Sequence, residues 1–227
     1  MSDPDMTQKT WTAVDNYVGE LLMGSDAELD EVLASSAEAG LPEIAVSPPQ
    51  GKFLMLLARA IAAKRVLEIG TLGGFSTIWL ARALAKGGRV VTIEVDPLHA
   101  KVAQANFKRV GLAAMIDLRL GKALEVLPKL AVEKGEAFDL VFIDADKQNI
   151  PDYFTWSLKL ARPGGLIIVD NVVRGGAVTN AGSRDPNVLG VRRFNDMLKD
   201  DPRVSATTIQ TVGTKGYDGF TLALVTG

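Results

Sequence analysis

The sequence contains no cysteine and a single histidine, His99. The absence of cysteine excludes disulfides, thiolate metal sites and a thiol nucleophile. A Ser-His-Asp triad would have to use His99, and the chain has no G-x-S-x-G motif of the kind that carries the nucleophile in α/β-hydrolases. Because His99 follows Asp96-Pro97 at the start of an expected helix, we predict that it faces solvent.

Long apolar runs and a strong net charge are also absent. No uninterrupted run approaches about 18 residues, the length of a membrane-spanning helix, and the N-terminal MSDPDMTQKT is polar with no apolar signal core. The net charge of −2 gives no overall attraction to nucleic acid or to anionic membranes. These absences predict a cytoplasmic protein that has no membrane partner.

The length and the hydrophobic content fit one large α/β domain. The chain has 227 residues, of which 47% are hydrophobic, enough for a sizeable core. Helical periodicity over 7–23 and 26–38 marks the first 45 or so residues as a helical addition to this domain. We therefore expect residues 1–227 to form a single domain.

Short apolar runs alternate with helical segments along the rest of the chain. Strands are predicted at 65–70, 89–96, 115–120, 138–144 and 165–170, and helices at 49–63, 74–86, 97–110, 122–134, 149–161 and 188–200. This alternation predicts parallel strands covered on both faces, which is a doubly wound, Rossmann-like α/β sheet. The last segments, RVSATTIQTV and GFTLALVTG, read as two strands, so we expect the sheet to end in an antiparallel pair.

The first of these strands runs into a glycine-rich turn, EIGTLGGFS, which contains Glu68, Gly70 and Ser76. Glycine lets the backbone turn tightly and approach a ligand. Leu72 stands where the dinucleotide-binding motif G-x-G-x-x-G has its second glycine, so the pyrophosphate of NAD would fit less well here. The acidic Glu68 would repel a phosphate and attract an ammonium or a sulfonium group.

The second strand ends with Glu94. An acid at this place can accept hydrogen bonds from both hydroxyls of a ribose. Together, the glycine turn and Glu94 are typical of a site for an adenosine cofactor that carries no phosphate, such as S-adenosylmethionine.

Charged and polar side chains follow the next two strands in the sequence FDLVFIDADKQN and in LIIVDN. Asp144, Asp146 and Lys147 follow one strand, and Asp170 and Asn171 follow the other. In an open parallel sheet these strand ends meet at one edge. Oxygen ligands without histidine or cysteine suit Mg²⁺, Mn²⁺ or Ca²⁺. The sequence therefore predicts that Asp144, Asp170 and Asn171 form a divalent-cation site, with Mg²⁺ as the expected ion.

Four stretches of the chain resemble the class I, cation-dependent O-methyltransferases, the family of caffeoyl-CoA and catechol O-methyltransferases, and above all its small bacterial branch. They are VLEIGTLGGFSTIWLARAL, GRVVTIEVDP, FDLVFIDADKQNIPDYF and RPGGLIIVDNVVRGGAV, and the resemblance runs from about Ser47 to the C-terminus. It implies a seven-stranded sheet whose last strand is antiparallel. It also implies transfer of methyl from S-adenosylmethionine to a catechol-type phenolic molecule, and commonly a homodimer.

The resemblance assigns roles residue by residue. Asp144, Asp170 and Asn171 match the family's metal ligands, and Lys147 matches the lysine proposed as general base, acting beside Asp144. The positions that match cofactor-binding residues are Val46, Glu68, Gly70, Thr71, Ser76, Glu94, Ala123, Asp144 and Asp146.

The chain departs from the family's pattern in three places. Arg174 stands where the family often has an aromatic residue that packs against the acceptor, which weakens the case for a phenylpropanoid-CoA substrate. Ile150 replaces a tyrosine that usually follows Lys147, although Tyr153 remains. The GTKGYDG loop before the last strand is longer than in many plant members.

Three alternatives remain at this point. The first is a related enzyme that methylates hydroxyuridine in transfer RNA, for which a basic patch would supply phosphate contacts. That patch would comprise Arg174, Arg184, Arg192, Arg193 and Lys199. The second is an NAD-dependent dehydrogenase of similar architecture, against which the missing glycine and the predicted metal ligands argue. The third is a non-catalytic binding module that keeps the cofactor pocket.

Overall fold

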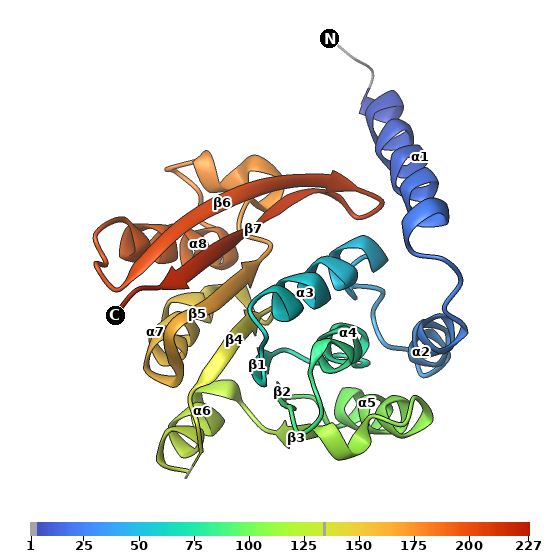
Figure 1. Cartoon of the computed structure of the whole chain (residues 1–227). Helices are drawn as coiled ribbons and strands as arrows, with labels where there is room; N and C mark the ends of the chain where they lie inside the picture. The colour runs from blue at the N-terminus through green and yellow to red at the C-terminus, as the bar shows by residue number, and fades with distance from the viewer. Residues whose placement is uncertain (1–3, 134) are drawn as a thin grey trace.

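The computed structural model describes residues 4–133 and 135–227, with side chains from Thr7 onward. Its centre is a seven-stranded sheet in the order β3-β2-β1-β4-β5-β7-β6 (Figure 1). The strands are β1 (Arg65–Ile69), β2 (Arg89–Glu94), β3 (Ile116–Leu120), β4 (Phe138–Ile143), β5 (Ala161–Asp170), β6 (Val204–Gly213) and β7 (Gly216–Val225). Strand β7 pairs antiparallel with both β5 and β6, and all other pairings among the described strands are parallel, so the predicted doubly wound sheet with an antiparallel end is confirmed.

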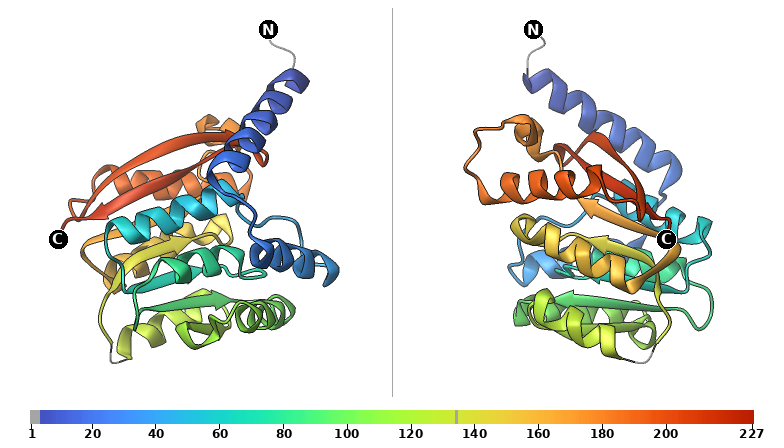
Figure 2. Two further views of the ribbon diagram at one scale, coloured as in Figure 1. Left: turned by 45° about the vertical axis from the view of Figure 1, so that its right-hand side comes forward. Right: turned by 90° about the vertical axis from the view of Figure 1, so that its left-hand side faces the viewer.

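Helices cover both faces of the sheet (Figure 2). One face carries α3 (Pro48–Ala60), α4 (Phe75–Ala83) and α5 (Pro97–Arg109), and the other carries α6 (Ala123–Val132), α7 (Ile150–Leu160) and α8 (Pro186–Lys199). Successive strand residues enter opposite cores, as their alternating side chains require: Val66 packs with α3 and α4, and Leu67 packs with α6 and α7. The central strands are thus buried on both faces, which explains their continuous apolar sequences.

The chain begins with α1 (Pro4–Leu22) and α2 (Ala27–Glu38). Helix α1 lies beside the β6–β7 hairpin and extends past the sheet (Figure 2). Gln8 Nε2 donates to the carbonyl of Gly213 at 2.9 Å, and the backbone N–H of Thr214 donates to Asp15 Oδ2 at 2.7 Å. Helix α2 packs against α4 and α5 instead. The polar contacts of α1 therefore attach it to the β6–β7 edge of the sheet, away from α2.

The order of the strands places the ligand site. The chain runs outward from β1 through β2 to β3 and then crosses back to β4 on the other side of β1, so a crevice opens beyond the carboxyl ends of β1 and β4. Three short 3₁₀ turns also occur: η1 (Ala113–Met115), η2 (Lys147–Asn149) and η3 (Arg174–Thr179). Of these, η2 follows β4 and η3 follows β5, so both lie at this edge of the sheet. Within the described chain, no helix combines the length and the apolar character needed to cross a membrane.

Candidate active site

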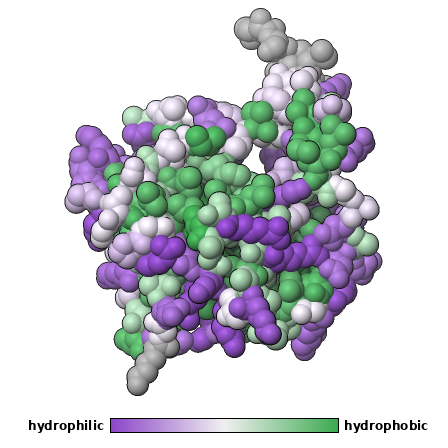
Figure 3. Space-filling view, viewed as in Figure 1, coloured by the Kyte–Doolittle hydropathy of each residue, from purple (hydrophilic) through white to green (hydrophobic). Residues whose placement is uncertain are grey.

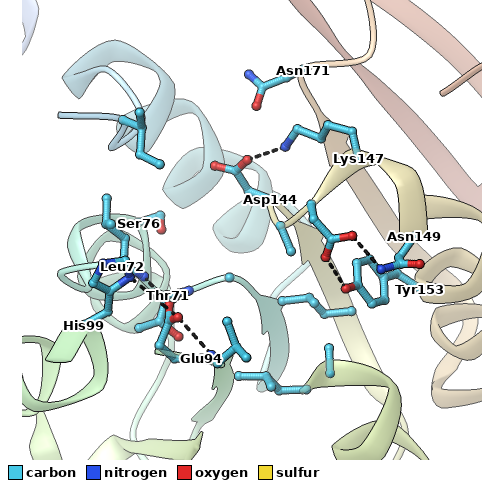
Figure 4. Close-up of a pocket in the computed structure, with 18 of the residues that line it drawn as sticks. Thr71, Leu72, Ser76, Glu94, His99, Asp144, Lys147, Asn149, Tyr153 and Asn171 are labelled. Carbon is cyan, nitrogen blue, oxygen red and sulfur yellow. Dashed lines mark hydrogen bonds and ion pairs between the residues drawn. The ribbon is translucent and has the colours of Figure 1, made fainter. Parts of the chain in front are cut away.

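A cavity of about 650 Å³ lies at the crevice beyond β1, β2 and β4 (Figure 4). Its walls come from the segment 44–46, the glycine turn after β1, the start of α6 and the residues after β4 and β5. Most of the predicted site residues line it: Val46, Gly70, Thr71, Ser76, Glu94, Ala123, Asp144, Asp146, Lys147 and Asn171. The structure therefore brings residues from six separate parts of the chain to one cavity.

The glycine turn is held in a conformation that few residues adopt. Gly70 has φ +101°, and a Cβ on it would lie 2.2 Å from the carbonyl oxygen of Asp144, so glycine is required by both backbone and space. Leu72, which stands where the dinucleotide-binding motif has its second glycine, also has a positive φ of 51°. The turn thus passes directly over the end of β4, close to the carboxylates that follow that strand.

Glu94 fixes this turn. Its Oε2 accepts hydrogen bonds from the backbone N–H groups of Thr71 (3.2 Å) and Leu72 (2.8 Å), as Figure 4 shows. Its Oε1 accepts two more from Val95 and Asp96, both at 2.9 Å. A carboxylate offers about four acceptor positions, so the carboxylate predicted to bind ribose is already fully hydrogen-bonded to the backbone.

His99 does not face solvent as predicted. It lines the cavity, 23% of its side chain is exposed, and its Nδ1 lies 3.7 Å from Glu94 Oε1. Asp96 caps α5 by accepting hydrogen bonds from the N–H groups of Leu98 and His99, and this cap places His99 in the first turn, directly below Glu94. Sequence reasoning recognised the helix start but missed the direction of the side chain.

Glu68 lies beneath the glycine turn and is fully buried. Its carboxylate accepts hydrogen bonds from the hydroxyls of Ser76 and Thr92, both at 2.6 Å, and from the hydroxyl of Thr77. Burial raises the pKa of Glu68 to about 7, although the three hydroxyl donors act to lower it. Among the described residues Glu68 is not part of the cavity wall, so any influence on a ligand passes through Ser76 and the turn.

The predicted metal ligands lie at the ends of two adjacent strands. Ile143 pairs with Val169 in the parallel register of β4 and β5, so Asp144 and Asp170 follow side by side. Lys147, which is 8% exposed, donates from Nζ to Asp144 Oδ1 at 2.8 Å (Figure 4). Asn171 has a left-handed backbone, φ +56°, which asparagine tolerates, and its side chain lies on the same side of the cavity (Figure 4).

Asp170 is the most constrained member of this group. It is 4% exposed, Gln50 Nε2 donates to its Oδ2 at 2.6 Å, and the Asn171 N–H donates to its Oδ1 at 2.8 Å. Burial and the charge of Asp144 raise the pKa of Asp170 to about 7, against the opposing effect of Lys147. Two carboxylates held close together repel each other, so binding of a cation between them is favoured.

A second small network holds Asp146. Its carboxylate accepts hydrogen bonds from the hydroxyl of Tyr153 and from Asn149 Nδ2, the latter at 2.6 Å (Figure 4). Burial and this contact raise the pKa of the Tyr153 phenol. Tyr153 and Asn149 both line the cavity, so this pair orients the acid that the family resemblance places beside the cofactor.

Three further residues at the site were not predicted to act there: Gln50, Asn149 and His99. Gln50 comes from the start of α3, where the sequence SPPQG showed only a helix start. Arg174, noted as a departure from the family, lines the cavity at the beginning of η3.

Comparison with known proteins gives a consistent result. The profile of a family described as O-methyltransferase matches residues 23–225. The chain is 51% identical to a catechol O-methyltransferase of Niastella koreensis over 220 residues, covering 97% of this chain and 100% of that protein. It is 55% identical to a catechol O-methyltransferase of Mycobacterium tuberculosis over 212 residues, covering 93% and 94%.

Solved structures agree. An O-methyltransferase from Bacillus cereus in complex with SAH superposes with a TM-score of 0.95 at 56% identity, over 96% of this chain and 99% of that one. The O-methyltransferase TomG from Streptomyces achromogenes, in complex with SAM, gives 0.94 at 53% identity, over 97% and 99%.

Proposed function

The chain belongs to the O-methyltransferase family, and we propose that it transfers methyl from S-adenosylmethionine to one hydroxyl of a catechol-type aromatic molecule with the help of a divalent cation. Dependence on S-adenosylmethionine follows from the family and from relatives whose structures contain SAH or SAM. The observation that carries the finer proposal is that Asp144 and Asp170 directly follow the paired residues Ile143 and Val169, with Lys147 hydrogen-bonded to Asp144. Asp144 and Asn171 line the cavity, whereas Asp170 does not belong to its described lining.

The donor set suits a hard cation. Asp144, Asp170 and Asn171 would hold it through carboxylate and amide oxygens. Burial, and next the charge of Asp144, raise the pKa of Asp170. When bound, the cation would bring together the two oxygens of a catechol and make its hydroxyl more acidic. Gln50 supports this arrangement because it fixes one Asp170 oxygen from the first turn of α3.

The adenosine end of the cofactor is expected at Glu94 and His99. Ala123, at the start of α6, and Val46, from the segment before α3, line the same cavity. The ribose hydroxyls would share Glu94 Oε2 with the amides of Thr71 and Leu72, so cofactor binding is expected to alter the glycine turn.

Lys147 is the candidate general base. Lys147 is nearly buried, and its amine lies within hydrogen-bond distance of Asp144. The amine is therefore expected beside the hydroxyl of the acceptor. In the proposed reaction Lys147 accepts the hydroxyl proton, the acceptor oxygen bonds to the methyl carbon, and the carbon–sulfur bond breaks. The walls of the cavity align oxygen, carbon and sulfur, and this alignment supplies much of the rate.

Chelation tests the proposal. Methylation of 3,4-dihydroxybenzoate, a simple catechol, should stop in EDTA and return on addition of Mg²⁺ or Mn²⁺. Binding of S-adenosylmethionine, followed by calorimetry in the same buffers, should persist in EDTA. Full turnover in chelator would remove the cation from the proposal.

A homodimer is proposed from the exposed apolar face formed by β6, β7, α1 and α3 (Figure 3). Its exposed members are Val14, Tyr17, Leu21, Leu22, Leu56, Ile209, Val212, Tyr217 and Leu224. Strand β6 is also one of the two edge strands of the sheet. Exposed apolar patches and edge strands of this kind favour association, and the family resemblance supports a second copy as the partner.

The alternatives lose support. Membership of the O-methyltransferase family excludes the dehydrogenase. Members of the basic patch expected to bind RNA have internal contacts instead: Arg192 donates to the carbonyl of Val178, and Arg193 to that of Gln148.

A further inference from the structure

Arg174 occupies an unusual position at the acceptor end of the cavity. It follows Asn171 closely in the chain and lines the cavity wall. Its backbone is left-handed, φ +56°, which is uncommon for arginine. Asp218 on β7 holds this conformation, because its Oδ1 accepts hydrogen bonds from the N–H groups of Val173 and Arg174, both at 2.9 Å. Asp218 thus fixes the backbone of the turn that follows Asp170 and Asn171, and the side chain of Arg174 extends from this fixed turn.

The guanidinium of Arg174 is only partly satisfied. Its Nη1 lies 3.9 Å from Asp218 Oδ2, a long ion pair, and 31% of the side chain is exposed. Its Nε is buried and has no hydrogen-bond partner among the described residues. Arginine cannot shed this proton at ordinary pH, and a buried donor left unpaired is costly. The exposed part of the side chain therefore offers donors that a ligand in the cavity can use.

Nearby negative charges satisfy Arg174 only in part, through the long ion pair with Asp218 Oδ2. Asp144 is paired with Lys147, and Asp170 is held by Gln50 and by the backbone. Asp218 uses Oδ1 for backbone donors, including the N–H of Gly219 at 3.0 Å. The unused donors of Arg174 are thus left for the contents of the cavity.

We propose that Arg174 binds an anionic substituent, a carboxylate, on the aromatic acceptor, so that the enzyme prefers acidic catechols to neutral ones. This inference rests on the proposed function. The planar guanidinium presents parallel N–H donors that match the two oxygens of a carboxylate. With the catechol oxygens held at the Asp144–Asp170 end and the carboxylate at Arg174, the ring has one orientation, so Arg174 also influences which hydroxyl is methylated.

The test compares acids with amides of nearly equal shape. The first pair of substrates is 3,4-dihydroxybenzoate and 3,4-dihydroxybenzamide. The second pair is 3,4-dihydroxycinnamate and its amide, in which the carboxylate or amide group lies farther from the catechol ring. For the parent enzyme we expect a higher kcat/KM with the acid in at least one pair. In Arg174→Met the ratio of acid to amide should fall about 10- to 100-fold, the usual range for a charge-assisted hydrogen bond. Arg174→Lys, which keeps the charge, should retain part of the preference.

Arg184→Met is the matched control. Arg184 lies in the loop before α8, is exposed, and is not among the described residues that line the cavity, so its removal should leave the ratio unchanged. Circular dichroism and binding of S-adenosylmethionine establish that each variant is folded.

The outcomes separate the two proposals. If the parent methylates none of the four catechols, the proposed function fails. If it methylates them but the acid-to-amide ratio is the same in Arg174→Met as in the parent, the role of Arg174 is overturned. An equal loss with acid and amide would assign Arg174 to packing against the ring and would overturn the proposal as well.

Discussion

The side-chain amide of Gln50 lies 2.6 Å from Asp170 Oδ2, and 120 positions of sequence separate the two residues. The contact joins the first turn of α3 to the end of β5. Both carboxylate oxygens of the nearly buried Asp170 accept hydrogen bonds, one from the Asn171 N–H and one from Gln50, so the orientation of the carboxylate depends on Gln50. Ligand orientation by a neighbouring hydrogen bond commonly determines the affinity of a metal site.

Gln50→Ala should therefore raise the Mg²⁺ concentration that gives half-maximal activity, by about 10-fold or more. The maximal rate at saturating Mg²⁺ should change less, since the ligands themselves remain. Gln104→Ala, an exposed glutamine on α5, is the control and should behave as the parent. An unchanged Mg²⁺ requirement in Gln50→Ala would show that Asp170 does not need this support.

Gly70 provides a test of the glycine turn. In Gly70→Ala the new Cβ would lie 2.2 Å from the carbonyl oxygen of Asp144, in addition to the strain of a positive φ. Gly87 also has a positive φ, but a Cβ there meets nothing within 4 Å, so Gly87→Ala isolates the backbone cost. Urea unfolding should give Gly70→Ala a free-energy loss at least about 1–3 kcal/mol larger than that of Gly87→Ala. Equal losses would contradict the close approach of the two strand ends.

Much of this site was predictable because parallel strands deliver their carboxyl ends to one edge of a sheet. Glu94, Asp144 and Asp170 were found in the sequence for that reason, since each ends a strand or directly follows one. Their partners were not found. Gln50 lies at a helix start after two prolines, and no periodicity links that position to a distant strand.

The directions of the Arg174 and His99 side chains could not be predicted from the sequence either. The conformation of Arg174 depends on Asp218, which lies on a strand that is remote in sequence. The prediction for His99 was wrong because a helix start after Asp-Pro usually faces solvent, whereas here α5 begins beneath Glu94 and turns the imidazole toward the cavity. Tertiary packing decided both cases, and local sequence carries little information about it.

Removing the amine of Lys147 should slow methyl transfer. Loss of a general base typically costs about 10²–10⁴-fold in rate, so kcat of Lys147→Met with 3,4-dihydroxybenzoate should fall in that range while S-adenosylmethionine still binds. The deficit should shrink at alkaline pH, where solvent ionises the catechol without help. Lys101→Met, on the exposed side of α5, should keep the parental pH profile. A deficit that is constant across the pH range would give Lys147 a role other than proton acceptance.

The proposed dimer gives a prediction for the apolar face of β6. Val212→Lys places a charge on that face and should convert a dimer into monomers in sedimentation or light-scattering measurements. Val132→Lys makes the same substitution on α6, where the side chain is 84% exposed at the other end of the sheet, and should not change the assembly. A parent protein that is monomeric at all accessible concentrations would contradict the proposal directly.

The Glu68 network predicts an unusual dependence of stability on pH. Because the pKa of Glu68 is raised from 4.5 to about 7 in the folded protein, the folded state keeps a proton that the unfolded chain has lost between these values. This contribution to stability is fully present below about pH 4.5 and is lost as the pH rises through about 7. Glu68→Gln stays neutral throughout and lacks the effect. Relative to Glu68→Gln, the parent should lose on the order of 1–3 kcal/mol of unfolding free energy between about pH 5 and pH 8.

Asp170 titrates in both proteins, so its effect cancels in the comparison. Urea unfolding in chelator measures the difference at each pH, and a difference that does not vary with pH would mean that Glu68 is ionised in the folded protein over this whole range.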